Sequence, residues 1–162
     1  MTKRQVPWFV RAGLVAAAYM ALTFAFAPVS YGMIQFRVSE ILNLLAFYNP
    51  VYIPGIVLGC ALANLSSPLG MIDVVVGSFH TLVSLLFMAK MKNKWVGSLG
   101  PTLFSFIIGL EIAYVSNDWN LVLPVTLSVA LSEFVICTLV SVPVYSQLEK
   151  NHAVRDRVLR HD

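Results

Sequence analysis

The chain alternates between apolar stretches and short polar breaks. Six apolar stretches follow one another, and the breaks between them contain proline, glycine, asparagine or charged residues. The pattern predicts helical membrane spans at residues 8–28, 36–48, 51–65, 71–89, 96–115 and 121–145. Because a full crossing needs about 20 residues, the second and third spans are short, either separate helices or a tight hairpin.

The composition supports a membrane protein. Hydrophobic residues make up 58% of the 162 residues, charged residues make up 12%, and the mean hydropathy is +0.77. A soluble domain carries about 25% charged residues. We therefore expect an all-α protein whose residues 1–162 form one integral membrane domain, a six-helix transmembrane bundle with a charged cytoplasmic tail at 147–162. The net charge of +3 lies in the flanks of the spans, so we expect no nucleic acid partner.

Basic residues gather on one side of the predicted bundle. They are Lys3, Arg4, Arg11, Lys90, Lys92, Lys94, Lys150, Arg155, Arg157 and Arg160. Only Arg37 falls near the other side. Since cytoplasmic flanks are enriched in lysine and arginine, the sequence predicts a multi-pass protein of the cell membrane with both termini in the cytoplasm. Residues 28–35, 66–70 and 116–120 would then face outside.

A polar stripe interrupts the second apolar stretch. Arg37, Glu40 and Asn43 recur every three residues and therefore lie on one helical face. Charge in hydrocarbon is costly, by about 2.5 kcal/mol or more at the bilayer centre, so this face should turn toward the bundle interior. One interpretation is the wall of a binding cavity; another is a structural ion pair between Arg37 and Glu40.

Further acids fall in other spans. In the predicted topology Glu40, Asp73 and Glu111 lie in the outer half of the membrane, and Glu133 lies near its middle. Asp73 and His80 share one helical face. Polar groups that converge in an apolar bundle indicate a ligand site, and carboxylates favour a cationic or donor-rich ligand. Each residue also has a structural alternative, such as a helix cap for Asp73 or an ordinary buried histidine for His80.

Sequence motifs for enzymatic chemistry are absent. The chain lacks a phosphate-binding loop, a Ser-His-Asp or Cys-His arrangement, and the HExxH motif. Cys60 and Cys137 lie inside apolar stretches without metal-ligand spacing and read as packing residues. We therefore expect a protein that is not an enzyme, with no catalytic residues, no metal and no cofactor. Its energy must come from an ion gradient or a partner, unless it is a passive channel.

Three segments resemble the QueT family, the substrate-binding S components of energy-coupling factor (ECF) transporters for queuosine precursors. They are APVSYGMIQFRVSEILNLLAFYNPVYIPGIVLGCALANL, DVVVGSFHTLVSLL and IIGLEI, in that order. The resemblance extends from about Ala12 to Glu133, and IQFRVSE is its most specific part. It implies a substrate of the 7-deazaguanine type, 7-aminomethyl-7-deazaguanine, which has a guanine-like ring and a cationic arm. It also implies partners: a transmembrane T component and two cytoplasmic ATPase subunits.

The resemblance also bears on the site. It favours a pocket built by the outer loops and the last three helices, and leaves Glu40 and Asn43 as candidates for a supporting role. With the polar stripe included, the predicted substrate-binding residues are Gln35, Arg37, Glu40, Asn43, Asp73, His80, Glu111 and Glu133.

Small residues cluster in the first span. Ala12 and Ala16 have the spacing that allows close helix approach, which serves either packing within the protein or contact with a partner. In S components the small-residue face of the first helix docks on the T component. The resemblance therefore predicts a partner-docking face at Ala12, Gly13, Ala16 and Ala17.

Two other functions remain open from the sequence. The chain could be an S component for another vitamin or nucleobase, such as a pyrimidine, pterin or flavin. It could also be an autonomous ion-coupled transporter or channel that uses His80, Glu111 and Glu133 as a proton relay. Binding measurements with a panel of ligands would distinguish the first alternative from a 7-deazaguanine-binding protein. Uptake by the chain alone would distinguish the second from a subunit that needs a partner.

Overall fold

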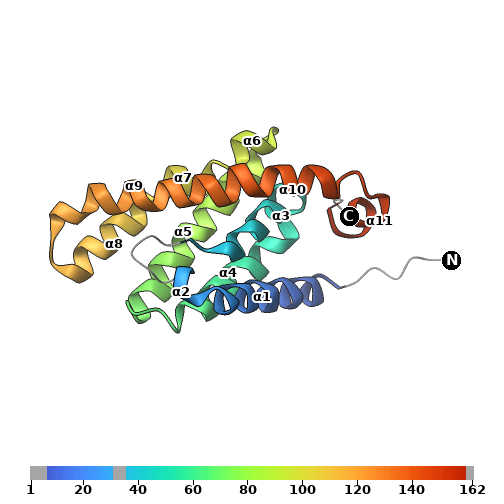
Figure 1. Ribbon diagram of the computed structural model, residues 1–162. Helices are drawn as coiled ribbons and strands as arrows, with labels where there is room; N and C mark the ends of the chain where they lie inside the picture. The colour runs from blue at the N-terminus through green and yellow to red at the C-terminus, as the bar shows by residue number, and fades with distance from the viewer. Residues whose placement is uncertain (1–6, 31–35, 160–162) are drawn as a thin grey trace.

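The computed structural model describes residues 7–30 and 36–159, and all regular structure in these residues is helical (Figure 1). Helix α1 (Trp8–Ala25) leads into the short α2 (Ala27–Ser30). The 3₁₀ helix η1 (Val38–Leu44), α3 (Leu45–Tyr48), η2 (Pro50–Tyr52) and α4 (Ile53–Asn64) follow. Helix α5 (Met71–Lys90) then crosses the molecule between α1 and the C-terminal helices.

The second half of the chain forms a long hairpin. One arm contains α6 (Lys94–Gly97), α7 (Gly100–Phe104) and α8 (Phe106–Ser116). The turn η3 (Trp119–Leu121) leads into the other arm, α9 (Val122–Glu133), the π-helical η4 (Phe134–Val140) and α10 (Ser141–Leu148). This second arm runs along the whole length of the molecule in Figure 1.

Within residues 7–30 and 36–159, four helical segments are long and apolar enough to cross a membrane. They are Trp8–Ala25, Met71–Lys90, Lys94–Ser116 and Trp119–Leu148. The segments Val38–Tyr48 and Pro50–Asn64 are apolar but shorter. All six predicted stretches are therefore helical, but the prediction of six membrane-spanning helices is not confirmed, because two of them are too short by length alone.

Polar residues lie inside the described bundle and apolar residues lie outside. Arg37, Glu40 and Asp73 are at most 8% exposed, whereas Val75 and Leu127 on the outer surface are 67% and 60% exposed. A soluble protein would show the opposite distribution. Lipid solvates apolar side chains and penalises charges. The apolar surface is therefore compatible with a bilayer, and the buried charges are compatible with a polar site inside the bundle.

Helices α1 and α4 approach closely through small residues. A Cβ atom at Gly59 would lie 2.8 Å from Cβ of Tyr19 and 2.9 Å from the carbonyl of Ala16, and one at Gly55 would collide with the backbone of Ala12. Ala12 and Ala16 are consequently buried against α4, with 8% and 4% exposure. In this structure Ala12 and Ala16 pack against α4, which corresponds to the alternative of packing within the protein, while the partner-docking face stays a prediction.

The polar stripe is carried by a 3₁₀ helix rather than an α-helix. With about three residues per turn, side chains at i and i+3 eclipse one another. Arg37 immediately precedes η1, and Glu40 and Asn43 follow on the same face; all three are buried. The predicted inward orientation of the stripe is confirmed, and the tighter helix aligns it more closely than an α-helix would.

The C-terminal tail packs back on the bundle. Helix α11 (His152–Val154) and the π-helical η5 (Arg155–Leu159) form a compact turn, and Leu159 is only 3% exposed. The hydroxyl of Tyr52 donates a hydrogen bond to the carbonyl of Val158 at 2.8 Å. The tail sequence is charged and only weakly amphipathic, so it gave little indication that Leu159 would join the apolar core.

Candidate functional site

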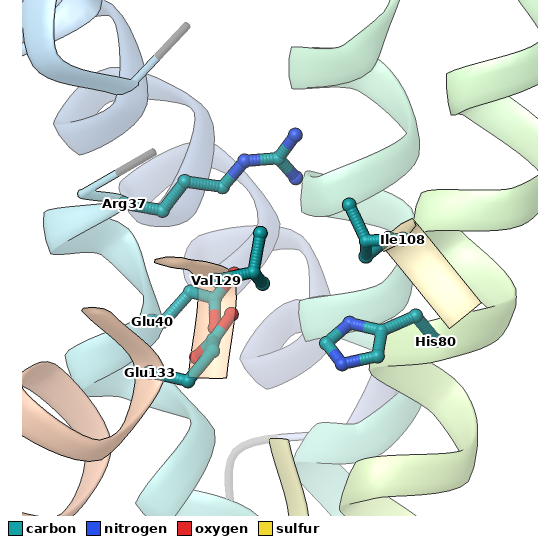
Figure 2. Close-up of a pocket in the computed structure, with 6 residues that line it drawn as sticks. All are labelled: Arg37, Glu40, His80, Ile108, Val129 and Glu133. Carbon is teal, nitrogen blue, oxygen red and sulfur yellow. The ribbon is translucent and has the colours of Figure 1, made fainter. Parts of the chain in front are cut away.

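A polar cavity lies where the 3₁₀ helix, α5, α8 and α9 meet. Figure 2 shows the six residues that line it, which are Arg37, Glu40, His80, Ile108, Val129 and Glu133. Its volume of about 10 Å³ holds roughly one water molecule. A base-sized ligand therefore needs the surrounding side chains or helices to move apart before it can occupy this site.

An ion pair crosses one side of the cavity. The guanidinium of Arg37 lies 3.4 Å from Oδ2 of Asp73, and both side chains are buried. The amide of Asn64 donates to the backbone carbonyl of Asp73 at 2.9 Å and to its Oδ1 at 3.3 Å. Asp73 thus holds Arg37 in place from α5. In the described residues Asp73 does not cap α5 with its side chain. The ion-pair partner of Arg37 is Asp73 rather than Glu40.

Two acids meet on the opposite side. Glu40 of η1 and Glu133 at the end of α9 turn their carboxyl groups toward each other (Figure 2). Their ligand oxygens and the Sγ of Cys137 all lie within 4.8 Å of one another. The amide of Asn43 donates to Glu40 at 3.3 Å, and the thiol of Cys137 donates to Glu133 at 3.4 Å. Among the described residues, these three side chains form the group whose geometry could hold a metal ion.

His80 closes the cavity from α5. Its Nε2 lies 3.2 Å from the carbonyl of Pro101 at the start of α7. Because a carbonyl can only accept, Nε2 carries the proton. This contact fixes the ring, which faces the cavity in Figure 2.

Glu111 is a buried acid whose carboxylate forms no hydrogen bond within the described residues. It is 4% exposed, and neither carboxylate oxygen has a hydrogen-bond partner in residues 7–30 and 36–159. It lies on α8, near enough to Asp73 and Arg37 for electrostatic interaction. A buried carboxylate without a partner is costly, so its retention here is typical of a residue that binds something else.

The structure brings together most of the predicted site residues. Arg37, Glu40, His80 and Glu133 line the cavity, while Asn43 and Asp73 contact two of these residues. Glu111 is buried beside them, and Gln35 lies outside the described residues. The roles of these residues in binding remain a prediction.

Three participants were missed from the sequence. Asn64 was not singled out, although an asparagine inside an apolar helix is itself a signal of an internal partner. Cys60 lies 3.9 Å from the guanidinium of Arg37, and Cys137 contacts the acid pair. Nothing in their spacing distinguishes these cysteines from packing residues.

A second, open pocket lies where Phe47 meets the α5–α6 connection and Glu149. Phe47, Lys92, Asn93, Lys94, Trp95 and Glu149 line it. Lys94 donates to Glu149 at 2.7 Å. Burial acts to raise the pKa of Glu149, but the hydrogen bond and charge of Lys94 outweigh it, so the pKa lies below its usual value. Most of these side chains are partly or fully exposed, which makes this pocket a weaker candidate for ligand recognition.

Two comparisons with known proteins give a match. The family model described as "QueT transporter" matches residues 9–150. A protein of Lactococcus lactis subsp. cremoris (strain MG1363) named "Queuosine precursor transporter QueT" is 39% identical over 121 residues, which is 70% of this chain and 71% of that protein. No solved structure matches the chain.

Proposed function

The chain belongs to the QueT transporter family, and from this premise we propose that it binds 7-aminomethyl-7-deazaguanine as the S component of an ECF importer. The family and the named relative support transport of a queuosine precursor. The observation that carries the choice of ligand is the set of buried acids, Glu40, Glu111 and Glu133, around a polar cavity in an apolar bundle. Such a site suits a planar base rich in N–H donors that also carries an ammonium.

The recognition chemistry follows from the donor inventory. The Watson–Crick edge of a guanine-like ring presents two parallel N–H donors, which one carboxylate can accept together. Glu111 is suited to this role because both its oxygens lack partners in the described residues. The aminomethyl arm adds a cation, which an acid can neutralise. His80 and Arg37 can supply further polar contacts to the ring from the cavity wall.

Binding must be coupled to opening of the bundle. The cavity of about 10 Å³ is far smaller than the roughly 300 Å³ typical of small-molecule pockets. We propose that α8 and α9 move away from η1 and α5 to admit the ligand, since this hairpin carries Glu111 and Glu133.

The partner module docks on the part of α1 that α4 does not cover. Gly13 and Ala17 are exposed, and a Cβ atom at Gly13 would meet nothing within 4 Å. These two residues retain the small-residue spacing of the predicted docking face. We propose that they contact a transmembrane T component, which with two ATPase subunits supplies the energy. The six-helix S-component arrangement and cytoplasmic termini are part of this proposal.

Isothermal titration of detergent-purified protein tests the ligand. We expect submicromolar binding of 7-aminomethyl-7-deazaguanine and weaker binding of guanine. The absence of binding for every 7-deazaguanine would reject the substrate and turn attention to a pyrimidine, pterin and flavin panel.

Uptake assays test the partner. In cells that contain the full transporter, Ala17→Leu should abolish uptake and leave ligand binding unchanged. Val75→Leu, on an exposed face of α5, is the control and should preserve uptake. Wild-type uptake in Ala17→Leu would place the docking surface elsewhere. Uptake by liposomes that hold this chain alone, driven by a pH gradient, would replace the ECF mechanism with an ion-coupled one.

A further inference from the structure

The open pocket beside Phe47 lies where three segments of membrane-spanning length end or begin. Helix α5 ends at Lys90, the segment Lys94–Ser116 begins just after it, and Glu149 directly follows the segment Trp119–Leu148. Because an apolar span ends where the hydrocarbon core ends, side chains at these positions lie at the depth of lipid headgroups. The pocket has a volume of about 350 Å³, which is within the range of sites that bind small molecules.

The lining of this pocket carries an excess of positive charge. Lys92 and Lys94 line it, and Lys90 precedes them at the end of α5. The acid in the lining is Glu149, which accepts a hydrogen bond from Lys94 at 2.7 Å. Lys90 and Lys92 are exposed and form no ion pair with any described residue. Two lysine charges are therefore left to attract an anion into the pocket.

An apolar strip continues from the pocket along the outside of the segment Lys94–Ser116. Trp95, in the lining, is 48% exposed, and tryptophan favours the boundary between lipid and water. Val96, Leu103 and Leu110 follow at intervals of seven residues, which places them on one helical side, and each is at least 44% exposed. A cationic pocket that adjoins an apolar strip matches a ligand with an anionic head and apolar chains.

We propose that this pocket binds the headgroup of an anionic phospholipid, whose acyl chains lie along the apolar strip. The phosphate accepts hydrogen bonds from Lys92 and Lys94, since the ammonium of Lys94 has three donors and gives one of them to Glu149. The exposure that weakens this pocket as a site for a water-soluble ligand suits a lipid, which approaches from the bilayer and leaves its outer side in water. Basic pockets at helix ends are a recurrent form of lipid recognition.

Lipid titration of the detergent-purified, full-length chain tests the site, with bound lipid counted by native mass spectrometry. Phosphatidylglycerol and phosphatidylcholine with the same acyl chains differ in net charge. We expect one saturable phosphatidylglycerol site with an affinity at least about tenfold higher than that for phosphatidylcholine, because each lysine near an anionic headgroup contributes about fivefold. Equal binding of the two lipids would overturn the proposal. Glycerol 3-phosphate has the anionic head without the chains and should bind far more weakly; if it binds as tightly as the lipid, the ligand is a soluble phosphate instead.

The variant Lys92→Gln removes one charge from the lining, and we expect its phosphatidylglycerol affinity to fall about fivefold. Lys150→Gln is the matched control, because it removes the same charge from an exposed lysine next to Glu149 that does not line the pocket. Its affinity should match the wild type. Unchanged affinity in Lys92→Gln, or an equal loss in both variants, would show that the pocket does not select the lipid. Both side chains are exposed, so both variants should fold, and no outcome bears on the proposed substrate.

Discussion

Arg37 and Asp73 form a buried ion pair, with 3.4 Å between the guanidinium and the carboxylate, that joins the segment before η1 to the first turn of α5. The positive charge of Arg37 is therefore neutralised by an acid from another helix. Glu40, three residues further along, is left to meet Glu133 of α9. One tertiary contact thus separates the polar stripe into a structural half and a half suited to binding.

Loss of this pair should destabilise the protein. Asp73→Asn leaves the guanidinium of Arg37 buried without its counter-ion, and breaking such a pair costs about 3–5 kcal/mol. We expect a marked fall in the thermal midpoint in detergent, measured by the fluorescence of the native tryptophans. The control Asp118→Asn keeps the oxygen that accepts from Asn120 in an exposed turn and should change the midpoint little. Equal midpoints for the two variants would contradict a structural role for the pair.

Glu111 should show opposite effects on stability and binding. Glu111→Gln removes a buried carboxylate that has no partner in the described residues, so thermal stability should stay the same or rise. The same change should weaken ligand affinity about tenfold to hundredfold, the loss expected for a charge-assisted hydrogen bond of about 1.5–3 kcal/mol. Calorimetry and thermal unfolding on one preparation measure both. Glu149→Gln, in the other pocket, is the matched control, and unchanged affinity in Glu111→Gln would remove Glu111 from the site.

The α1–α4 contact distinguishes two glycines of similar sequence context. Gly59→Ala places a methyl group 2.8 Å from Tyr19 Cβ and 2.9 Å from the Ala16 carbonyl, so the helices must separate. We expect a loss of about 1–3 kcal/mol, as for other overpacked cores. Gly13→Ala meets nothing within 4 Å and should be neutral or stabilising by up to about 1 kcal/mol. Thermal unfolding of both variants checks the comparison, and equal stabilities would mean that the helices do not pack this closely.

The tail should detach when its apolar anchor is shortened. Leu159→Ala removes most of a side chain that is 3% exposed, which costs about 2 kcal/mol or more. Trypsin cleavage at Arg155 should then become at least about tenfold faster, because cleavage follows the open population. Val158→Ala, at a side chain that is 38% exposed, should leave the rate nearly unchanged. Rapid cleavage of the wild type would show that the tail is not held by this contact.

The sequence predicted where the helices lie, but not the type of each helix. Hydrophobic runs of helical length located all six helical stretches, and Pro50, Gly70 and Asn117 lie at or beside breaks between helices. The 3₁₀ form of η1 and the π-helical η4 were not predictable, because both depend on how side chains fit against neighbouring helices rather than on residue preference. The same holds for the burial of Leu159, which depends on a surface formed by residues over a hundred positions earlier.

The sequence by itself determined that the chain is an all-helical membrane protein whose charges must face inward, since bilayer energetics apply to each span separately. It also nominated the acids, because a carboxylate in an apolar run is rare enough to stand out. Which acid meets which group was decided only by the tertiary structure. Arg37 could pair with Glu40 or Asp73, and Ala12 and Ala16 could face a partner or α4. Local spacing leaves such alternatives close in energy, and the packing of the whole bundle selects between them.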